Sequence, residues 1–263
     1  MDNLFLIQVL LSFLIAGSWI AFSSLVAEKL GSKVGGLIAN LPANLLISLL
    51  FVTFVRDVSY VTEAVLAVPA GLINTTIFLV VFVMCLRWGL LAASLVSLVT
   101  WFANALLLNH IGQINLLLGI LCYIGFVILV VIALEKLMPD TAVKALRKQY
   151  SMSQIAGRAV FSGGVVASVV LISKFSPPYF TGIFATFPAM LFTTMFILAR
   201  SQGPLFARSV GKVLVLTTSN LLVYALAVYL TYPRFGVAWG TVISYLASVI
   251  WVFSLFPLVK RLA

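Results

Sequence analysis

Long apolar stretches separated by short polar connections dominate the chain. At 1.5 Å of rise per residue, a helix of about 20 apolar residues crosses the hydrocarbon core of a bilayer. Nine such stretches can be marked, and they are residues 4–27, 34–55, 63–86, 88–108, 114–137, 156–174, 179–199, 208–230 and 235–257. This pattern predicts an all-α polytopic membrane protein with nine transmembrane helices.

One segment of the second stretch returns later in the chain. Residues 35–45 (GGLIANLPANL) resemble residues 181–191 (TGIFATFPAML), which lie 146 positions further on. The identical pairs are Gly36/Gly182, Ala39/Ala185, Pro42/Pro188, Ala43/Ala189 and Leu45/Leu191. The same offset, without gaps, also holds for the pairs Gly17/Gly163 and Asn74/Asn220. Because matched Gly, Pro and Asn are harder to explain by composition than matched apolar residues, the register predicts an internal duplication.

The distribution of Lys and Arg predicts the orientation, since cytoplasmic loops carry an excess of both residues. With the N-terminus outside, thirteen basic residues fall on the cytoplasmic side: Lys29, Lys33, Arg87, Lys136, Lys144, Arg147, Lys148, Arg158, Arg200, Arg208, Lys212, Lys260 and Arg261. Only Arg56, Lys174 and Arg234 fall outside. We therefore expect an N-out, C-in protein.

The repeat and the orientation together predict the domain organisation. Residues 1–110 form a first four-helix repeat, residues 111–149 a linker helix and a cytoplasmic loop, and residues 150–263 a second four-helix repeat. Because a single helix joins the two repeats, the second one enters the membrane from the opposite face. This 4+1+4 plan therefore has inverted topology, an arrangement that is common in secondary transporters.

Composition supports a membrane location and excludes several classes of function. The chain is 63% hydrophobic and 8% charged, whereas soluble domains carry about 25% charged residues. The net charge of +10 would suit a nucleic-acid partner, but the basic residues lie at the ends of the apolar stretches, where orientation explains them. Cys85 and Cys122 lie within apolar stretches, so no disulfide is expected. We expect a multi-pass protein of the cell (inner) membrane, with the lipid bilayer as its surroundings.

Proline interrupts both copies of the repeated segment. Proline has no N–H to donate, so the carbonyl four residues before it loses its helical partner. Inside a bilayer such a break persists only where protein, water or a ligand satisfies the carbonyl. We therefore expect hinges or helix breaks at Gly36, Pro42, Gly182 and Pro188. Purely structural kinks, with the glycines allowing close helix packing, are the alternative.

Several polar residues fall near the middle of the predicted spans, where they should face the interior of the bundle. The candidate substrate-binding residues are Asn40, Asn44, Asn74, Thr186 and Asn220. Inverted repeats would bring Pro42 near Pro188 and Asn74 near Asn220, around a polar chamber between the halves. The competing interpretation is that the amides only join helices by hydrogen bonds.

The sequence lacks the residues needed for proton-coupled cation export and for several kinds of enzyme chemistry. None of the six acidic residues lies near the predicted bilayer centre, which argues against proton-driven export of cations. No zinc-protease, nucleophile-elbow or Walker motif occurs, so neither an enzyme nor a metal or other cofactor is expected.

Residues 156–258 resemble the GlpM-type family of small inner-membrane proteins with four predicted spans. The resemblance depends on residues 179–191, on the aromatic segment from Tyr224 to Tyr229, and on Trp251. It implies a tandem version of such a protein, with a role in envelope or transport functions, and it supplies no substrate. Small multidrug-resistance exporters share the four-span inverted plan, but they carry a glutamate in the first span, where this chain has Ser12, Gly17 and Ser18.

Two functions follow from these patterns. The first is a permease that moves a small neutral or anionic solute by alternating access. A coupling ion such as sodium could be held by the freed carbonyls, and the protein could form a homodimer. The second is a non-transporting accessory protein of an envelope polysaccharide or lipid pathway. The second function requires that the polar residues pair with one another and leave no cavity.

Overall fold

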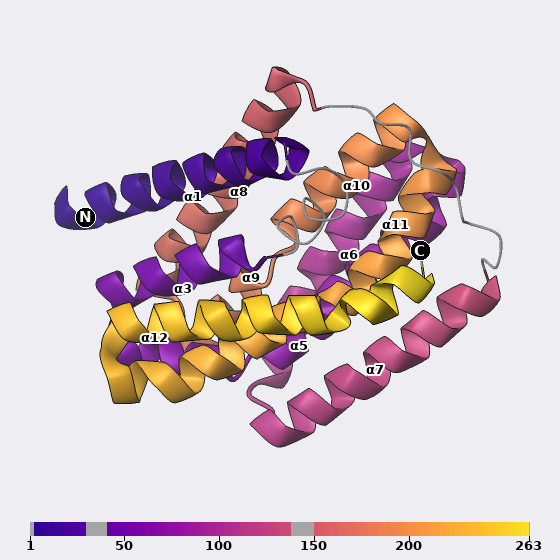
Figure 1. Cartoon of the computed structure of the whole chain (residues 1–263). Helices are drawn as coiled ribbons and strands as arrows, with labels where there is room; N and C mark the ends of the chain where they lie inside the picture. The colour runs from indigo at the N-terminus through magenta and orange to yellow at the C-terminus, as the bar shows by residue number, and fades with distance from the viewer. Residues whose placement is uncertain (1–2, 30–40, 138–149, 263) are drawn as a thin grey trace.

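The computed structural model describes residues 3–29, 41–137 and 150–262, and every secondary-structure element in these ranges is a helix (Figure 1). In chain order the helices are α1 (Asn3–Lys29), α3 (Ala43–Val55), α4 (Val58–Val65), α5 (Val68–Cys85), the short 3-10 helix η1 (Leu86–Trp88), α6 (Leu90–Ile111), α7 (Leu116–Leu137), α8 (Met152–Phe175), α9 (Pro178–Ala185), α10 (Ala189–Gln202), α11 (Pro204–Thr217) and α12 (Ser219–Leu262). The prediction of an all-α protein is confirmed for this part of the chain.

Seven helical stretches within the described ranges are long and apolar enough to cross a membrane. They are Asn3–Val26, Val68–Trp88, Leu90–Ile111, Leu116–Leu137, Met152–Phe175, Pro178–Gln202 and Pro204–Leu255. The last stretch has 52 residues, which at 1.5 Å each gives about 78 Å, more than twice the thickness of the hydrocarbon core. The chain is thus built as a multi-pass membrane protein. The count of nine spans stays a prediction, because the described part of the 34–55 stretch is only the 13-residue helix α3.

Two stretches predicted as continuous spans are interrupted. Residues 63–86 divide between α4 and α5 because Pro69 has no N–H to donate to the carbonyl of Val65. Residues 208–230 divide between α11 and α12. Here the hydroxyls of Thr217 and Thr218 donate to carbonyls three residues earlier, at 3.0 and 2.7 Å, and compete with the helical pattern.

Helices α1 and α8 pack against each other through two glycines (Figure 1). A Cβ atom added at Gly17 would lie 3.1 Å from the carbonyl oxygen of Ala159, and one added at Gly163 would lie 2.6 Å from that of Phe13. Residue numbers rise along one helix as they fall along the other. The two helices therefore run in opposite directions where they cross.

Helix α12 bends back on itself at Gly236, whose φ of 73° lies in the left-handed region that favours glycine. The hydroxyls of Thr231 and Ser244 bond across the bend at 3.0 Å, and Ser248 donates to the Oδ1 atom of Asn220. These bonds join positions progressively further from Gly236. The two arms of α12 thus form an antiparallel hairpin, which Figure 1 shows in orange and yellow.

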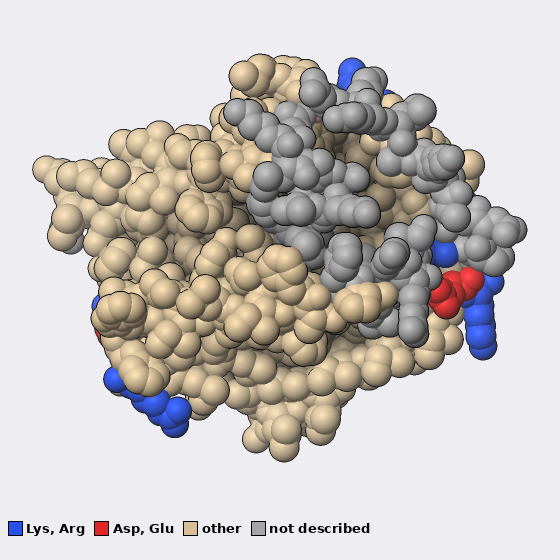
Figure 2. Space-filling model, in the orientation of Figure 1, with Lys and Arg blue, Asp and Glu red and all other residues tan. Residues whose placement is uncertain are grey.

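Apolar side chains cover the outer surface of the bundle. On α7, which lies at one margin of Figure 1, Leu117, Leu121 and Leu129 are exposed and suited to contact with lipid chains. Figure 2 shows one face of the molecule, on which the described residues across the middle are uncharged and the charged residues lie at the margins. This distribution is the one expected of a protein surrounded by a bilayer.

Candidate functional site

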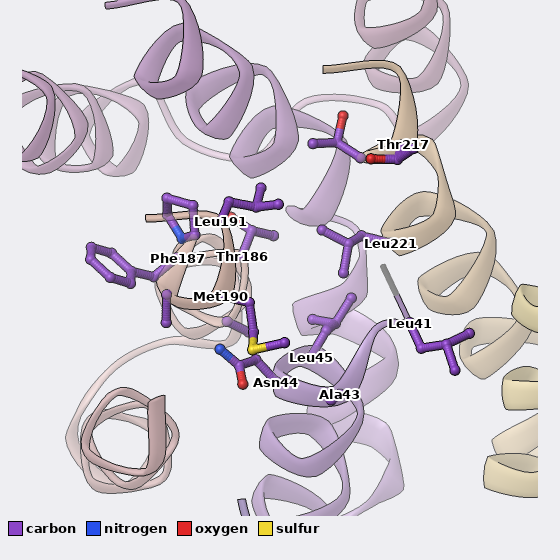
Figure 3. Close-up of a pocket in the computed structure, with 14 residues that line it drawn as sticks. Leu41, Ala43, Asn44, Leu45, Thr186, Phe187, Met190, Leu191, Thr217 and Leu221 are labelled. Carbon is purple, nitrogen blue, oxygen red and sulfur yellow. The ribbon is translucent and has the colours of Figure 1, made fainter. Parts of the chain in front are cut away.

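A cavity of about 50 Å³ lies where three helix junctions meet (Figure 3). The start of α3, the junction between α9 and α10, and the junction between α11 and α12 surround it. Four pairs of lining positions are related by the offset of 146: Leu41/Phe187, Ala43/Ala189, Asn44/Met190 and Leu45/Leu191. The volume has room for a few water molecules or a small ion. It is well below the roughly 300–1,000 Å³ of sites for drug-sized ligands.

Pro42 and Pro188 occupy the same place at the starts of α3 and α10. Their φ and ψ angles are −78° and 45° for Pro42, and −80° and 51° for Pro188. In both copies the N–H that follows the proline donates at 2.8 Å to the carbonyl that precedes it. The repeated segments therefore share local geometry as well as sequence, and each helix begins directly after its proline.

Asn44 is the predicted binding residue with unused hydrogen-bonding capacity at the cavity. Its Nδ2 and Oδ1 atoms are both buried and have no hydrogen-bond partner among the described residues. Leaving such a group unpaired costs about 1–3 kcal/mol. In Figure 3 the Asn44 amide and the Met190 thioether lie at the same end of the cavity. A polar solute at this position would supply the missing hydrogen bonds.

Thr186 and Gly182 lie on the α9 side of the site and are engaged in packing. The Thr186 hydroxyl donates to the carbonyl of Ile183 at 2.6 Å, and the Thr186 carbonyl accepts a bond from the Thr75 hydroxyl at 2.8 Å. Gly182 lies so close to the carbonyl of Ala64 that no side chain would fit between α9 and α4. Thr186 lines the cavity, whereas the close contact at Gly182 leaves little free space for a hinge there.

Asn74 and Asn220 each join two helical segments and do not line the cavity. The Asn74 amide donates to the carbonyl of Trp101 at 2.9 Å and so ties α5 to α6. Asn220 accepts from Ser248 and ties the two arms of α12 together. Both side chains are almost fully buried. Their observed contacts are those of interhelical hydrogen bonds, although the Oδ1 atom of Asn74 has no described partner.

Two of the predicted residues, Gly36 and Asn40, lie outside the described residues. The counterpart of the α9 segment, residues 32–39, falls in the same gap. The described lining of the cavity therefore comes from residues 41–45, from residues 185–191 and from Thr217, Thr218 and Leu221.

Arg158 is a polar residue beside the site that the sequence reasoning used only for orientation. It lies in the second turn of α8 and is 3% exposed. Its Nη2 atom donates to Thr194 Oγ1 at 3.2 Å and lies 3.8 Å from the sulfur of Met190, which lines the cavity. The signal that could have identified it is helical spacing, since Arg158 and the fully buried Ser162 are four residues apart and share a face.

None of the described residues that line the cavity is charged. Among the described residues no group of three or more His, Cys, Asp or Glu is arranged to hold a metal ion. The polar groups that line the cavity are the Asn44 amide and the hydroxyls of Thr186, Thr217 and Thr218. Such groups recognise a solute by hydrogen bonding.

Comparison with protein families shows a resemblance in the first part of the chain. A family model described as a protein of unknown function (DUF3147) matches residues 9–114, which is 106 of the 263 residues. The matched range nearly coincides with the first predicted repeat, residues 1–110. No curated protein and no solved structure matches the chain. The resemblance of residues 156–258 to the GlpM-type family gains no support from this match and stays a prediction.

Proposed function

We propose that the chain is a membrane permease that moves a small neutral or anionic solute by alternating access between two inverted repeats. In this mechanism one repeat rocks against the other and opens a central site to each side of the membrane in turn. Asn44 and Thr186 would contact the solute. Pro42 and Pro188 would allow α3 and α10 to change direction.

The contact between α1 and α8 supports a twofold relation between the repeats. Position 17 lies against position 159 and position 163 against position 13, and each of these contacts becomes the other when 146 is added or subtracted. Reciprocal contacts of this kind are typical of an interface with twofold symmetry. Because α1 and α8 run in opposite directions, the relation favours inverted repeats.

The observation that carries the proposal is the cavity bounded by both proline breaks. Equivalent positions of the two repeats line it in pairs, so it lies close to the inferred twofold axis. Transporters of inverted-repeat design place their substrate at such an interface, between interrupted helices. The volume of about 50 Å³ has room for a small solute only.

The predicted N-out, C-in orientation completes the proposal. The excess of Lys and Arg on one side places the start of α8, with Arg158, near the cytoplasm. The three units, residues 1–110, 111–149 and 150–263, keep their predicted roles as first repeat, linker and second repeat.

A second function is favoured by the hydrogen bonds of Asn74 and Asn220. Both amides are engaged within a helical hairpin, as expected of an accessory protein whose polar residues only hold helices together. The unpartnered Asn44 amide and the cavity beside it are what this second function does not explain.

Flux through proteoliposomes tests the two functions. The full chain would be reconstituted and the uptake of radiolabelled glycerol, urea, lactate and phosphate measured, with Asn44→Leu as the variant and Leu117→Ala on the exposed face of α7 as its control. We expect protein-dependent flux of at least one solute, reduced more than tenfold by Asn44→Leu and unchanged by Leu117→Ala. Flux that is equal in the Asn44→Leu variant, or absent for all four solutes, would contradict the proposal.

A further inference from the structure

We propose that Arg158 and Asn44 form a binding site for a small planar oxoanion, such as the carboxylate of a small organic acid. This inference rests on the proposed function and names the class of solute that the site would take. It starts from the guanidinium of Arg158, which is buried without a negatively charged partner among the described residues.

The contacts of Arg158 among the described residues leave its Nε donor unused. A guanidinium has five N–H donors and stays charged in proteins. Here Nη2 reaches Thr194 and Met190, the guanidinium carbon lies 5.1 Å from the centre of the Tyr150 ring, and Nε has no hydrogen-bond partner. A hydroxyl, a thioether and an aromatic ring cannot neutralise a positive charge.

A buried positive charge without a counter-charge is stabilised when an anion binds to it. Removing a cation from water costs several kcal/mol, and a counter-charge offsets this cost only when it sits in good hydrogen-bonding geometry. The planar fork of arginine matches two oxygens of a carboxylate or a related oxoanion. Nε has no partner and can donate to one oxygen of such an anion, while Nη2, which shares that edge of the fork, already donates to Thr194 Oγ1.

Asn44 supplies a second group with the same need. Its amide is buried and unpartnered, and its Nδ2 atom can donate to an anion oxygen. Met190 connects the two groups, because its sulfur contacts Arg158 while its side chain lines the cavity together with Asn44. Figure 3 shows the Asn44 amide beside Met190, and Arg158 contacts the same methionine from α8.

The proposed site has no counterpart at the equivalent positions of the other repeat, although the backbone around the cavity is built from equivalent segments. The position equivalent to Arg158 is Ser12, whose hydroxyl is already bonded to the carbonyl of Val9 at 2.7 Å, and the position equivalent to Asn44 is Met190 itself. Among the described residues, the unpaired Asn44 amide therefore lies in the cavity wall at the Met190 end, and the positive charge of Arg158 lies behind Met190, with no equivalent at the positions 146 residues away. The volume of about 50 Å³ restricts the anion to a small one.

Thermal unfolding of the full chain in detergent, followed by tryptophan fluorescence, tests the site. Sodium acetate and sodium nitrate would be titrated against sodium gluconate, which is too large for the cavity, at constant ionic strength. We expect acetate and nitrate to raise the Tm of the unaltered chain in a saturable way. The shift should be lost in Arg158→Gln and retained in Arg200→Gln, which removes an exposed arginine from the end of α10. No shift for either anion, or an equal shift in Arg158→Gln, would overturn the proposal.

A second variant guards against misfolding of Arg158→Gln. Asn44→Ala keeps the charge of Arg158 and should weaken acetate binding at least tenfold. The affinity is read from the acetate concentration that gives half of the Tm shift. Unchanged binding in this variant would exclude Asn44 from the site. The binding assay needs no transport. Saturable anion binding without flux in proteoliposomes would therefore remove the proposed function and leave the site, whereas flux that is unaffected by Arg158→Gln would remove the site and leave the function.

Discussion

Gly17 and Gly163 each lie against the backbone carbonyl of the residue four positions before the other glycine. Gly17 faces the carbonyl of Ala159, and Gly163 faces that of Phe13. The two glycines are 146 positions apart, the offset at which the proline motifs also recur. A Cβ atom at Gly163 would force α1 and α8 apart where they cross, and one at Gly17 would press tightly on the backbone of α8.

This crossing predicts different effects for two adjacent glycines. In Gly163→Ala the new Cβ would lie 2.6 Å from the Phe13 carbonyl oxygen, so the helices must shift. We expect a loss of about 1–3 kcal/mol in the free energy of unfolding. In Gly164→Ala the Cβ meets nothing within 4 Å, and the gain in helix propensity should stabilise the chain by up to about 1 kcal/mol. Unfolding in detergent distinguishes the two variants, and equal effects would contradict the close crossing.

Inverted repeats predict that equivalent positions lie on opposite sides of the membrane. Ser59 and Leu205 are 146 positions apart, and both are exposed near the start of a helix. In a chain with Cys85→Ala and Cys122→Ala, a maleimide that cannot cross the membrane should label Ser59→Cys in whole cells. It should label Leu205→Cys only after the cells are opened. Labelling of both positions from the same side would rule out the inverted arrangement.

Asn44 and Asn74 should respond in opposite ways to the same substitution. Asn44→Leu removes two buried polar atoms that have no described partner, so we expect stability to rise by about 1–3 kcal/mol. Asn74→Leu breaks the bond to the Trp101 carbonyl and should lower stability by about 1–2 kcal/mol. Chemical or thermal unfolding of both variants measures the difference. A destabilised Asn44→Leu variant would show that its amide has a structural partner.

Helix α7 is predicted to support both helix interruptions. The Tyr123 hydroxyl bonds to Thr218 Oγ1 at 2.8 Å at the α11–α12 junction, and Gly119 packs closely on Pro69 at the start of α5. Tyr123→Phe removes one buried hydrogen bond and should cost about 1 kcal/mol of stability. Tyr229→Phe, at a partly exposed position on α12, should leave stability unchanged and serves as the control. Equal Tm values for the two variants would show that the Tyr123–Thr218 bond contributes nothing.

Apolar stretches of about 20 residues were sufficient to predict the helical, multi-pass character of the chain. In a bilayer every backbone polar group must find a partner within the protein, and a helix provides one locally, without reference to the rest of the fold. The starts of α3 and α10 followed from Pro42 and Pro188 for the same reason, since a missing N–H acts on its own turn. Pro69 lacks an N–H in the same way, but no break between α4 and α5 was predicted from it.

Partnership between side chains was decided by the tertiary structure alone. Asn44, Asn74 and Asn220 were equivalent candidates in the sequence. Asn74 bonds to Trp101 in α6 and Asn220 to Ser248 in the other arm of α12, whereas Asn44 has no partner among the described residues. The burial of Arg158 likewise depends on how α8 packs against α10, which no local pattern specifies. Hydropathy and proline determine where helices form and end, because those effects act within a few residues. Only the packing of distant segments decides which polar groups remain free to bind a solute.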